Sequence, residues 1–191
     1  MLGSPVPVLG FAACSGTGKT TLLIRLIPLL ARRGLRIAMI KHAHHDFDID
    51  IPGKDSYELR RAGARQVLVA SDRRRALISE CSPPREPALA ELVAALDQDT
   101  LDLVLVEGFR HLPFPKIELH RPALGHPLLC REDRSIIAVA SDAAPECGAL
   151  PVLDINHPAG VADFIVGWLD AAEPRGAAST AGRSSPRFSG D

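Results

Sequence analysis

Short apolar segments recur along most of the chain, and most of them have glycine, proline or a charged residue at one end or both. Segments of this kind with few polar positions are typical of strands that are buried on both faces of a sheet. The predicted strands are residues 6–13, 35–40, 66–70, 76–79, 101–106, 116–120, 135–140 and 151–155. Elsewhere the apolar positions recur at helical spacing. The predicted helices are residues 18–33, 57–62, 88–96 and 159–171.

The alternation of strands with helices predicts an α/β fold with a largely parallel sheet flanked by helices. We also expect a small antiparallel β extension. Ligands of parallel sheets collect at the carboxyl ends of the strands. The turns after Ala13, Ile40, Val106 and Ala140 are therefore predicted to face one crevice.

The turn between the first strand and the first helix is made of small residues. It reads Cys14-Ser15-Gly16-Thr17-Gly18-Lys19-Thr20 and is followed by Thr21. Between a strand and a helix this is the pattern of a P-loop, in which successive backbone N–H groups and the helix N-terminus hold phosphate. Lys19 is expected to reach the outer phosphates, and the Thr20 hydroxyl to bind Mg²⁺. The predicted architecture is therefore the three-layer fold of P-loop NTPases.

The chain departs from the P-loop pattern at one position. The pattern has glycine five residues before Gly18, and this chain has Ala13 there. Glycine relieves crowding where the turn leaves the strand, so alanine is expected to be tolerated if its backbone angle φ is negative. An ordinary glycine-rich turn with a chance Lys-Thr pair is the alternative interpretation.

A carboxylate follows the most apolar of the predicted strands, where residues 101–106 lead into Glu107 and Gly108. In P-loop proteins an acid at the tip of a neighbouring strand binds Mg²⁺ directly or through water. Glu107 is therefore predicted to act with Thr20 at Mg²⁺, or to orient an attacking water. Lys19 and Glu107 are the candidate catalytic residues. A solvated carboxylate that merely ends a strand is the alternative.

The segment after the second strand, residues 41–55, is polar and irregular. The histidines and aspartates of its first ten residues, 41–50, are His42, His44, His45, Asp46, Asp48 and Asp50. The carboxylates suit hydrated Mg²⁺, with Asp46 as a candidate ligand, and the histidines suit a softer metal such as zinc or nickel. No cysteine accompanies them, and consecutive residues rarely converge on one ion. A nucleotide or substrate loop is therefore favoured, and a merely solvated loop stays open.

Further polar residues follow two of the strands. Asp142 comes after the strand 135–140, where a carboxylate can accept the N1–H and N2–H groups of guanine and reject adenine, which lacks that donor pair. The NKxD motif of many GTPases is absent, so a turn-forming aspartate is an equal alternative. Arg110 and His111 follow Glu107 and Gly108 and are well placed to meet an anion.

Composition narrows the class of protein. The chain has 191 residues, enough for one domain with a sizeable core, and a formal net charge of −1, which gives no general affinity for nucleic acid. Its 4 scattered cysteines indicate reduced thiols in the cytoplasm. No apolar run is long enough to span a membrane. We expect one domain over residues 1–172 and a disordered tail over 173–191, which is rich in glycine, proline and serine.

Several segments together carry a resemblance to a known family. They read ACSGTGKTTL, IKHAHHDFDID, PGKDSYELRRAGA, LDLVLVEGFRH and IAVASD. In order and spacing they resemble the MobB family of molybdopterin-guanine dinucleotide biosynthesis adaptor proteins, over about residues 8–171. PGKDSYELRRAGA and LVEGFRH carry the resemblance more specifically than Gly-Lys-Thr alone.

The resemblance implies properties that spacing does not show. Such proteins are homodimeric P-loop GTP-binding proteins with weak GTPase activity, and they assist the guanylyltransferase that joins GMP to molybdopterin. GTP and Mg²⁺ are the implied cofactors, and direct contact with molybdopterin stays open. Phosphate binding is carried over to Gly16, Gly18, Lys19, Thr20 and Thr21.

Other functions stay open. The histidines of residues 41–55 suggest a second function, that of a nickel or zinc metallochaperone. Related GTPases, however, pair their histidines with a cysteine site that is not found here. A small-molecule kinase also uses a P-loop, although the arginine-rich lid of many kinases is not evident. A scaffold with very slow GTP turnover is a further reading, because only Glu107 is a candidate to polarise water. The sequence does not define the dimer contacts, and an edge strand near residues 116–120 is a candidate place for them.

Overall fold

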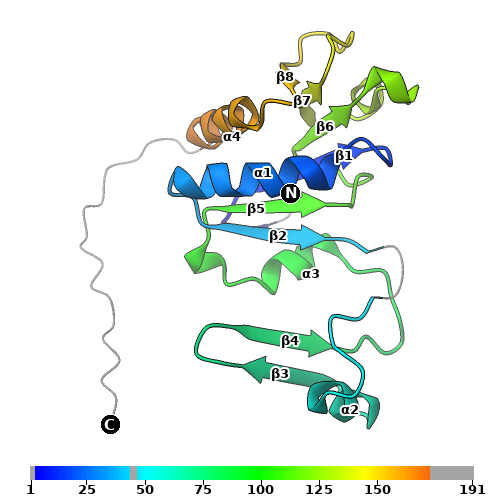
Figure 1. Ribbon diagram of the computed structural model, residues 1–191. Coiled ribbons are helices and arrows are strands. Elements are labelled where there is room, and N and C mark those ends of the chain that lie inside the picture. The colour runs from blue at the N-terminus through cyan, green and yellow to red at the C-terminus, as the bar shows by residue number, and fades with distance from the viewer. Residues whose placement is uncertain (1–2, 44–46, 173–191) are drawn as a thin grey trace, which may run out of the picture.

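The main sheet of the protein is parallel throughout, as seen in a computed structural model that describes residues 3–43 and 47–172 (Figure 1). Its strand order is β2-β5-β1-β6-β7-β8. The strands are β1 (Val8–Ala13), β2 (Ile37–Lys41), β5 (Leu103–Glu107), β6 (Lys116–His120), β7 (Ile136–Ser141) and β8 (Val152–Asp154). The first strand is therefore central, and the turn that follows it opens at the middle of the sheet's carboxyl edge.

Helices cover both faces of this sheet. Helices α1 (Lys19–Arg32) and α4 (Pro158–Ala172) pack on one face, and α3 (Leu89–Ala94) packs on the other (Figure 1). Side chains alternate along β1, so that Leu9 and Phe11 join the first cluster while Val8 joins the second. The predicted three-layer α/β fold is confirmed.

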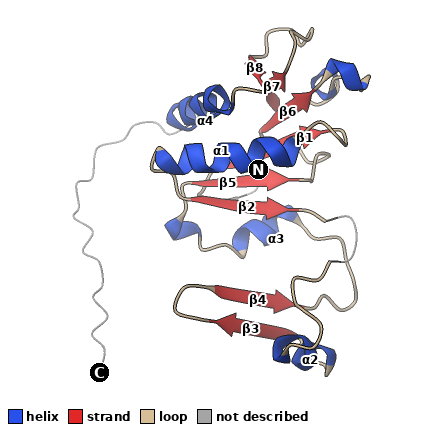
Figure 2. Ribbon diagram, in the orientation of Figure 1, coloured by secondary structure: helices blue, strands red, loops and turns tan. Residues whose placement is uncertain are grey.

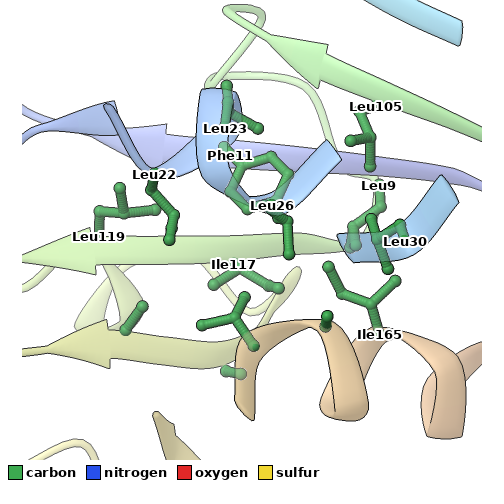
Figure 3. Close-up of a cluster of buried hydrophobic side chains, with 14 of the residues drawn as sticks. Leu9, Phe11, Leu22, Leu23, Leu26, Leu30, Leu105, Ile117, Leu119 and Ile165 are labelled. Carbon is green, nitrogen blue, oxygen red and sulfur yellow. The ribbon is translucent and has the colours of Figure 1, made fainter. Parts of the chain in front are cut away.

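The larger apolar cluster anchors the first helix. Leu22, Leu26 and Leu30 of α1 point onto β1 and β6, and Ile165 of α4 closes the cluster from the side (Figure 3). This packing fixes where α1 begins relative to the end of β1, and so it fixes the geometry of the turn between them.

A small antiparallel hairpin stands apart from the main sheet (Figure 2). It consists of β3 (Gln66–Ala70) and β4 (Arg75–Ser79), and helix α2 (Asp55–Arg61) contacts β3. The hairpin is the predicted antiparallel extension. Leu68 and Leu77 face each other across it and are 62% and 61% exposed, so this apolar pair has little cover from the rest of the described chain.

The expected elements are all present, and their ends differ from prediction by at most two residues. The predicted tail, 173–191, lies outside the described residues, and the domain boundary at 172 stays a prediction. None of the described helices has the length and hydropathy to cross a bilayer.

The prediction of an edge strand near residues 116–120 is wrong. Strand β6 lies between β1 and β7 and is buried along its whole length. Its charged side chains are paired with the segment that follows. Lys116 Nζ lies 3.0 Å from Asp133 Oδ2, and the Glu118 carboxylate accepts the N–H groups of Leu129 and Cys130. The charged side chains of β6 therefore have internal partners.

Candidate functional site

The turn between β1 and α1 depends on two glycines in the left-handed region. Gly16 has φ +79 and Gly18 has φ +93, and a Cβ at either position would meet nothing within 4 Å. Backbone conformation, and not crowding, therefore requires glycine there. Between them Thr17 is buried, and its hydroxyl donates to the Cys14 carbonyl at 2.7 Å, which ties the turn onto itself.

The backbone donors of this turn are free of protein acceptors. In the described parts of the chain, the N–H groups of residues 15–18 donate no hydrogen bond. The first N–H groups of α1 add to them, because a helix leaves its first donors without intrahelical partners. Thr20 and Thr21 are exposed at the start of α1. The turn is thus a concave set of donors suited to an anion.

Alanine is tolerated where the P-loop pattern has glycine. Ala13 ends β1, and among described residues Phe109 is the only non-glycine residue with positive φ. The condition set for tolerance, a negative φ at Ala13, is therefore met.

The two candidate catalytic residues face each other. Glu107 ends β5, which pairs with β1 so that Phe11 lies opposite Glu107. Lys19 begins α1, and its Nζ lies 3.8 Å from Glu107 Oε1. Both side chains are mostly buried, so solvent screens the attraction less than at an open surface. The structure therefore brings Lys19, Thr20 and Glu107 to one end of the sheet, as predicted.

Glu107 is held by contacts that sequence reasoning missed. The His42 N–H donates to the Glu107 carbonyl at 2.8 Å, and the His42 ring stacks on Phe109 with centroids 4.4 Å apart. Gly108 has φ +109, and a Cβ there would lie 2.5 Å from His42 Cβ. Phe109 has φ 51, a strained value for this residue type. The glycine after the strand was the available signal for this close approach.

The loop after β2 is only partly described, and the candidate ligand Asp46 lies outside the described residues with His44 and His45. The described aspartates are used locally. Asp48 pairs with Arg60 at 2.6 Å, and that hydrogen bond lowers the pKa of Asp48. Asp50 accepts the Ser56 hydroxyl at 2.9 Å. No cluster of three or more metal-ligating side chains occurs within residues 3–43 and 47–172.

Asp142 is linked to the turn between β1 and α1 by Arg121, which follows β6. Arg121 Nη1 donates to Asp142 Oδ2 at 2.5 Å, and Arg121 Nε donates to the Thr17 carbonyl at 3.1 Å. Arg121 and Asn156 line a pocket of about 130 Å³ beside Gly18. Neither Arg121 nor Asn156 was singled out from the sequence, because nothing in their neighbours marks them.

The family model for molybdopterin guanine dinucleotide synthesis protein B, MobB, matches residues 8–142. That span contains the turn, Glu107 and Asp142. The chain belongs to the MobB family.

Curated relatives and solved structures agree with this MobB assignment. The molybdopterin-guanine dinucleotide biosynthesis adapter protein of Escherichia coli K12 is 53% identical over 165 residues, which cover 86% of this chain and 94% of that protein. Its counterpart from Haemophilus influenzae is 43% identical over 168 residues, which cover 88% of this chain and 92% of that protein. A crystal structure of molybdopterin-guanine biosynthesis protein B superposes with a TM-score of 0.66 at 26% identity, covering 84% of this chain and 99% of that one. A Bacillus subtilis MobB structure shares the fold, with a TM-score of 0.67 at 24% identity, and the match covers 84% of this chain and 96% of that one.

Proposed function

We propose that this chain, a MobB-family adapter of molybdopterin-guanine dinucleotide synthesis, acts by binding GTP with Mg²⁺ at the turn between β1 and α1. The observation that carries the proposal is the pairing of Lys19 with Glu107 at 3.8 Å, beside a turn whose backbone donors have no protein acceptor in the described chain. A cation and a concave row of N–H groups suit a triphosphate. A carboxylate beside them suits the metal that accompanies it.

Each residue then has a distinct task. The N–H groups of residues 15–18 and the Lys19 ammonium bind the phosphates. The Thr20 hydroxyl and Glu107 hold Mg²⁺, which supplies charge neutralisation at the phosphates when bound. Glu107 also orients a water for slow hydrolysis of GTP. Asp46 remains a proposed additional ligand outside the described residues.

Guanine is the proposed base, with Asp142 as its acceptor. Arg121 reaches both Asp142 and the pocket beside Gly18. This supports a base site on the side of the turn away from Glu107. An aspartate can accept two N–H donors from guanine, and adenine offers no matching pair.

The proposed partner is the guanylyltransferase that joins GMP to molybdopterin, in the cytoplasm, with the adapter acting as a homodimer. The surface we assign to the second copy is the β3–β4 hairpin, because Leu68 and Leu77 are its most exposed apolar cross-strand pair. An isolated two-stranded hairpin is marginally stable in water, so cover from a second copy has a physical reason. Leu68→Glu with Leu77→Glu should then give monomers in analytical ultracentrifugation. If the double variant is still a dimer, the interface does not lie on the β3–β4 hairpin.

The nucleotide claim is tested by calorimetry. GTP and ATP, each with Mg²⁺, are titrated into the full chain and into Lys19→Ala. The matched control is Arg134→Ala, which removes an exposed cation outside residues 41–55 and away from the turn. We expect selective GTP binding that is lost in Lys19→Ala and kept in Arg134→Ala. Unchanged affinity in Lys19→Ala would overturn the site, and equal affinity for ATP would overturn the choice of guanine.

A further inference from the structure

Arg121 joins three loops that lie far apart in the sequence. Its Nε donates to the Thr17 carbonyl at 3.1 Å, Nη1 donates to Asp142 Oδ2 at 2.5 Å, and Nη2 donates to Asn156 Oδ1 at 3.2 Å. The loops follow β1, β7 and β8 respectively. Because the guanidinium group is planar and rigid, its three nitrogens fix these partners relative to one another.

Each contact of Arg121 ends on a different functional feature. Thr17 belongs to the phosphate-binding turn, where its own hydroxyl holds the Cys14 carbonyl. Asp142 is the proposed guanine acceptor. Asn156 and Arg121 both line the pocket of about 130 Å³ beside Gly18 and Thr21. One side chain therefore contacts the phosphate end of the site, the carboxylate and the wall of the pocket.

We propose that Arg121 is a positioning residue that makes the site selective for guanine nucleotides. This inference rests on the proposed function, and it assigns to Arg121 a task that neither the family match nor the sequence motifs provide. Arg121 occupies one lone pair of Asp142 Oδ2, and so fixes the carboxylate plane while Oδ1 and the second lone pair of Oδ2 remain for the N1–H and N2–H donors of guanine. Through its hydrogen bond to the Thr17 carbonyl, Arg121 also connects the proposed guanine site to the turn that is proposed to bind phosphate.

Lysine cannot reproduce this arrangement. Its ammonium is a single point on a flexible stem, so it cannot hold two oxygen acceptors on different loops and a third at planar angles. A lysine variant keeps the positive charge beside Asp142 but loses the fixed orientation. The chemistry thus separates a requirement for charge from a requirement for geometry.

The test compares ligands that differ by single features. Dissociation constants for GTP, ITP, ATP and inorganic tripolyphosphate, each with Mg²⁺, are measured by calorimetry for the full chain and for Arg121→Met. ITP lacks the 2-amino group of guanine, and tripolyphosphate has no base. The matched control is Arg134→Met, which removes an exposed arginine. Thermal unfolding of each variant reports whether it folds.

In Arg121→Met we expect the preference for GTP over ATP to fall about tenfold, since a misoriented charged acceptor loses hydrogen bonds of this strength. The preference for GTP over ITP should fall as well, while tripolyphosphate affinity changes by less than about threefold. Arg134→Met should match the wild type. An equal loss for all four ligands would reduce Arg121 to a structural clamp and overturn the inference, as would unchanged ratios.

Two further variants, Arg121→Lys and Asp142→Asn, test the geometry of Arg121 and its coupling to Asp142. Arg121→Lys is expected to have intermediate selectivity, and full wild-type selectivity would overturn the requirement for three-way geometry. Asp142→Asn should lower selectivity alone but add nothing in the Arg121→Met background, because both act on one interaction. Additive losses would contradict this coupling. If the wild type binds no nucleotide, the proposed function fails first; if it binds GTP selectively and Arg121→Met keeps that selectivity, only the inference fails.

Discussion

Lys19 Nζ and Glu107 Oε1 lie 3.8 Å apart across the end of the central strands, one at the start of α1 and the other at the end of β5. The ammonium that is assigned to phosphate is thereby already paired with the carboxylate that is assigned to Mg²⁺. Binding of a magnesium nucleotide would exchange this one ion pair for two, Lys19 with phosphate and Glu107 with the metal.

Glu107→Gln should separate the two halves of the exchange. The amide keeps the shape of the side chain but removes its charge, so Lys19 loses its partner and Mg²⁺ loses a ligand. Nucleotide binding in EDTA should be unchanged or tighter, while the gain in affinity on adding Mg²⁺ should fall about tenfold. Fluorescent-nucleotide titrations with and without Mg²⁺ measure both. A variant whose Mg²⁺ dependence equals that of the wild type would remove Glu107 from the metal site.

Gly108→Ala should destabilise the fold and disturb the site together. A Cβ at this position would lie 2.5 Å from His42 Cβ, and φ is +109. Crowding and backbone strain together should cost about 2 kcal/mol. The matched control, Gly125→Ala, has φ +68 with nothing within 4 Å, so strain alone should cost about 1 kcal/mol. Urea unfolding measures both, and an equal loss would show that the contact with His42 has no energetic weight.

Helix α1 offers a direct test of the core. Leu26 is completely buried against the sheet, whereas Ile24, two residues earlier, is 67% exposed. Leu26→Ala should reduce the free energy of unfolding by about 3 kcal/mol because it leaves a cavity. Ile24→Ala should change it by less than about 0.5 kcal/mol. Denaturation midpoints that fail to separate the two variants would contradict the packing of α1.

Thiol labelling should follow burial and charge. Burial, and then the neighbouring Glu118 carboxylate, raise the pKa of Cys130 to about 11, so its thiol is protonated at neutral pH. Because the thiolate is the reactive form, iodoacetamide should label exposed Cys81 first and Cys130 far more slowly, with the Cys130 rate still rising above pH 9. Peptide mass spectrometry across a pH series gives both rates. Cys130 labelling as fast as Cys81 at pH 7.5 would contradict the raised pKa of the partly buried Cys130 thiol.

The local parts of this molecule could be read from the chain. Apolar runs and helical periodicity depend on neighbours within a few residues, so each predicted element exists with ends within two residues. The turn between β1 and α1 is contiguous in sequence, and its glycines are required by their own φ values. The position of Glu107 near that turn was also predictable, because parallel strands end at one edge of the sheet.

The tertiary structure alone decided three other features. Strand β6 was predicted near an edge, yet it is buried, with Lys116 paired to Asp133 and Glu118 accepting the Leu129 N–H group. His42 stacks on Phe109 only because β2 and β5 are neighbours. Arg121 gathers its partners from loops after three different strands.

One physical reason separates the features that the sequence predicts from those that only the tertiary structure decides. Helix and strand formation and the glycine turn are determined by interactions between residues close in sequence, and these leave a periodic or contiguous signal. Charge pairing and ring stacking join residues that meet only once the strand order is set. That order follows from how the whole chain buries its apolar surface, so no short segment carries a record of it.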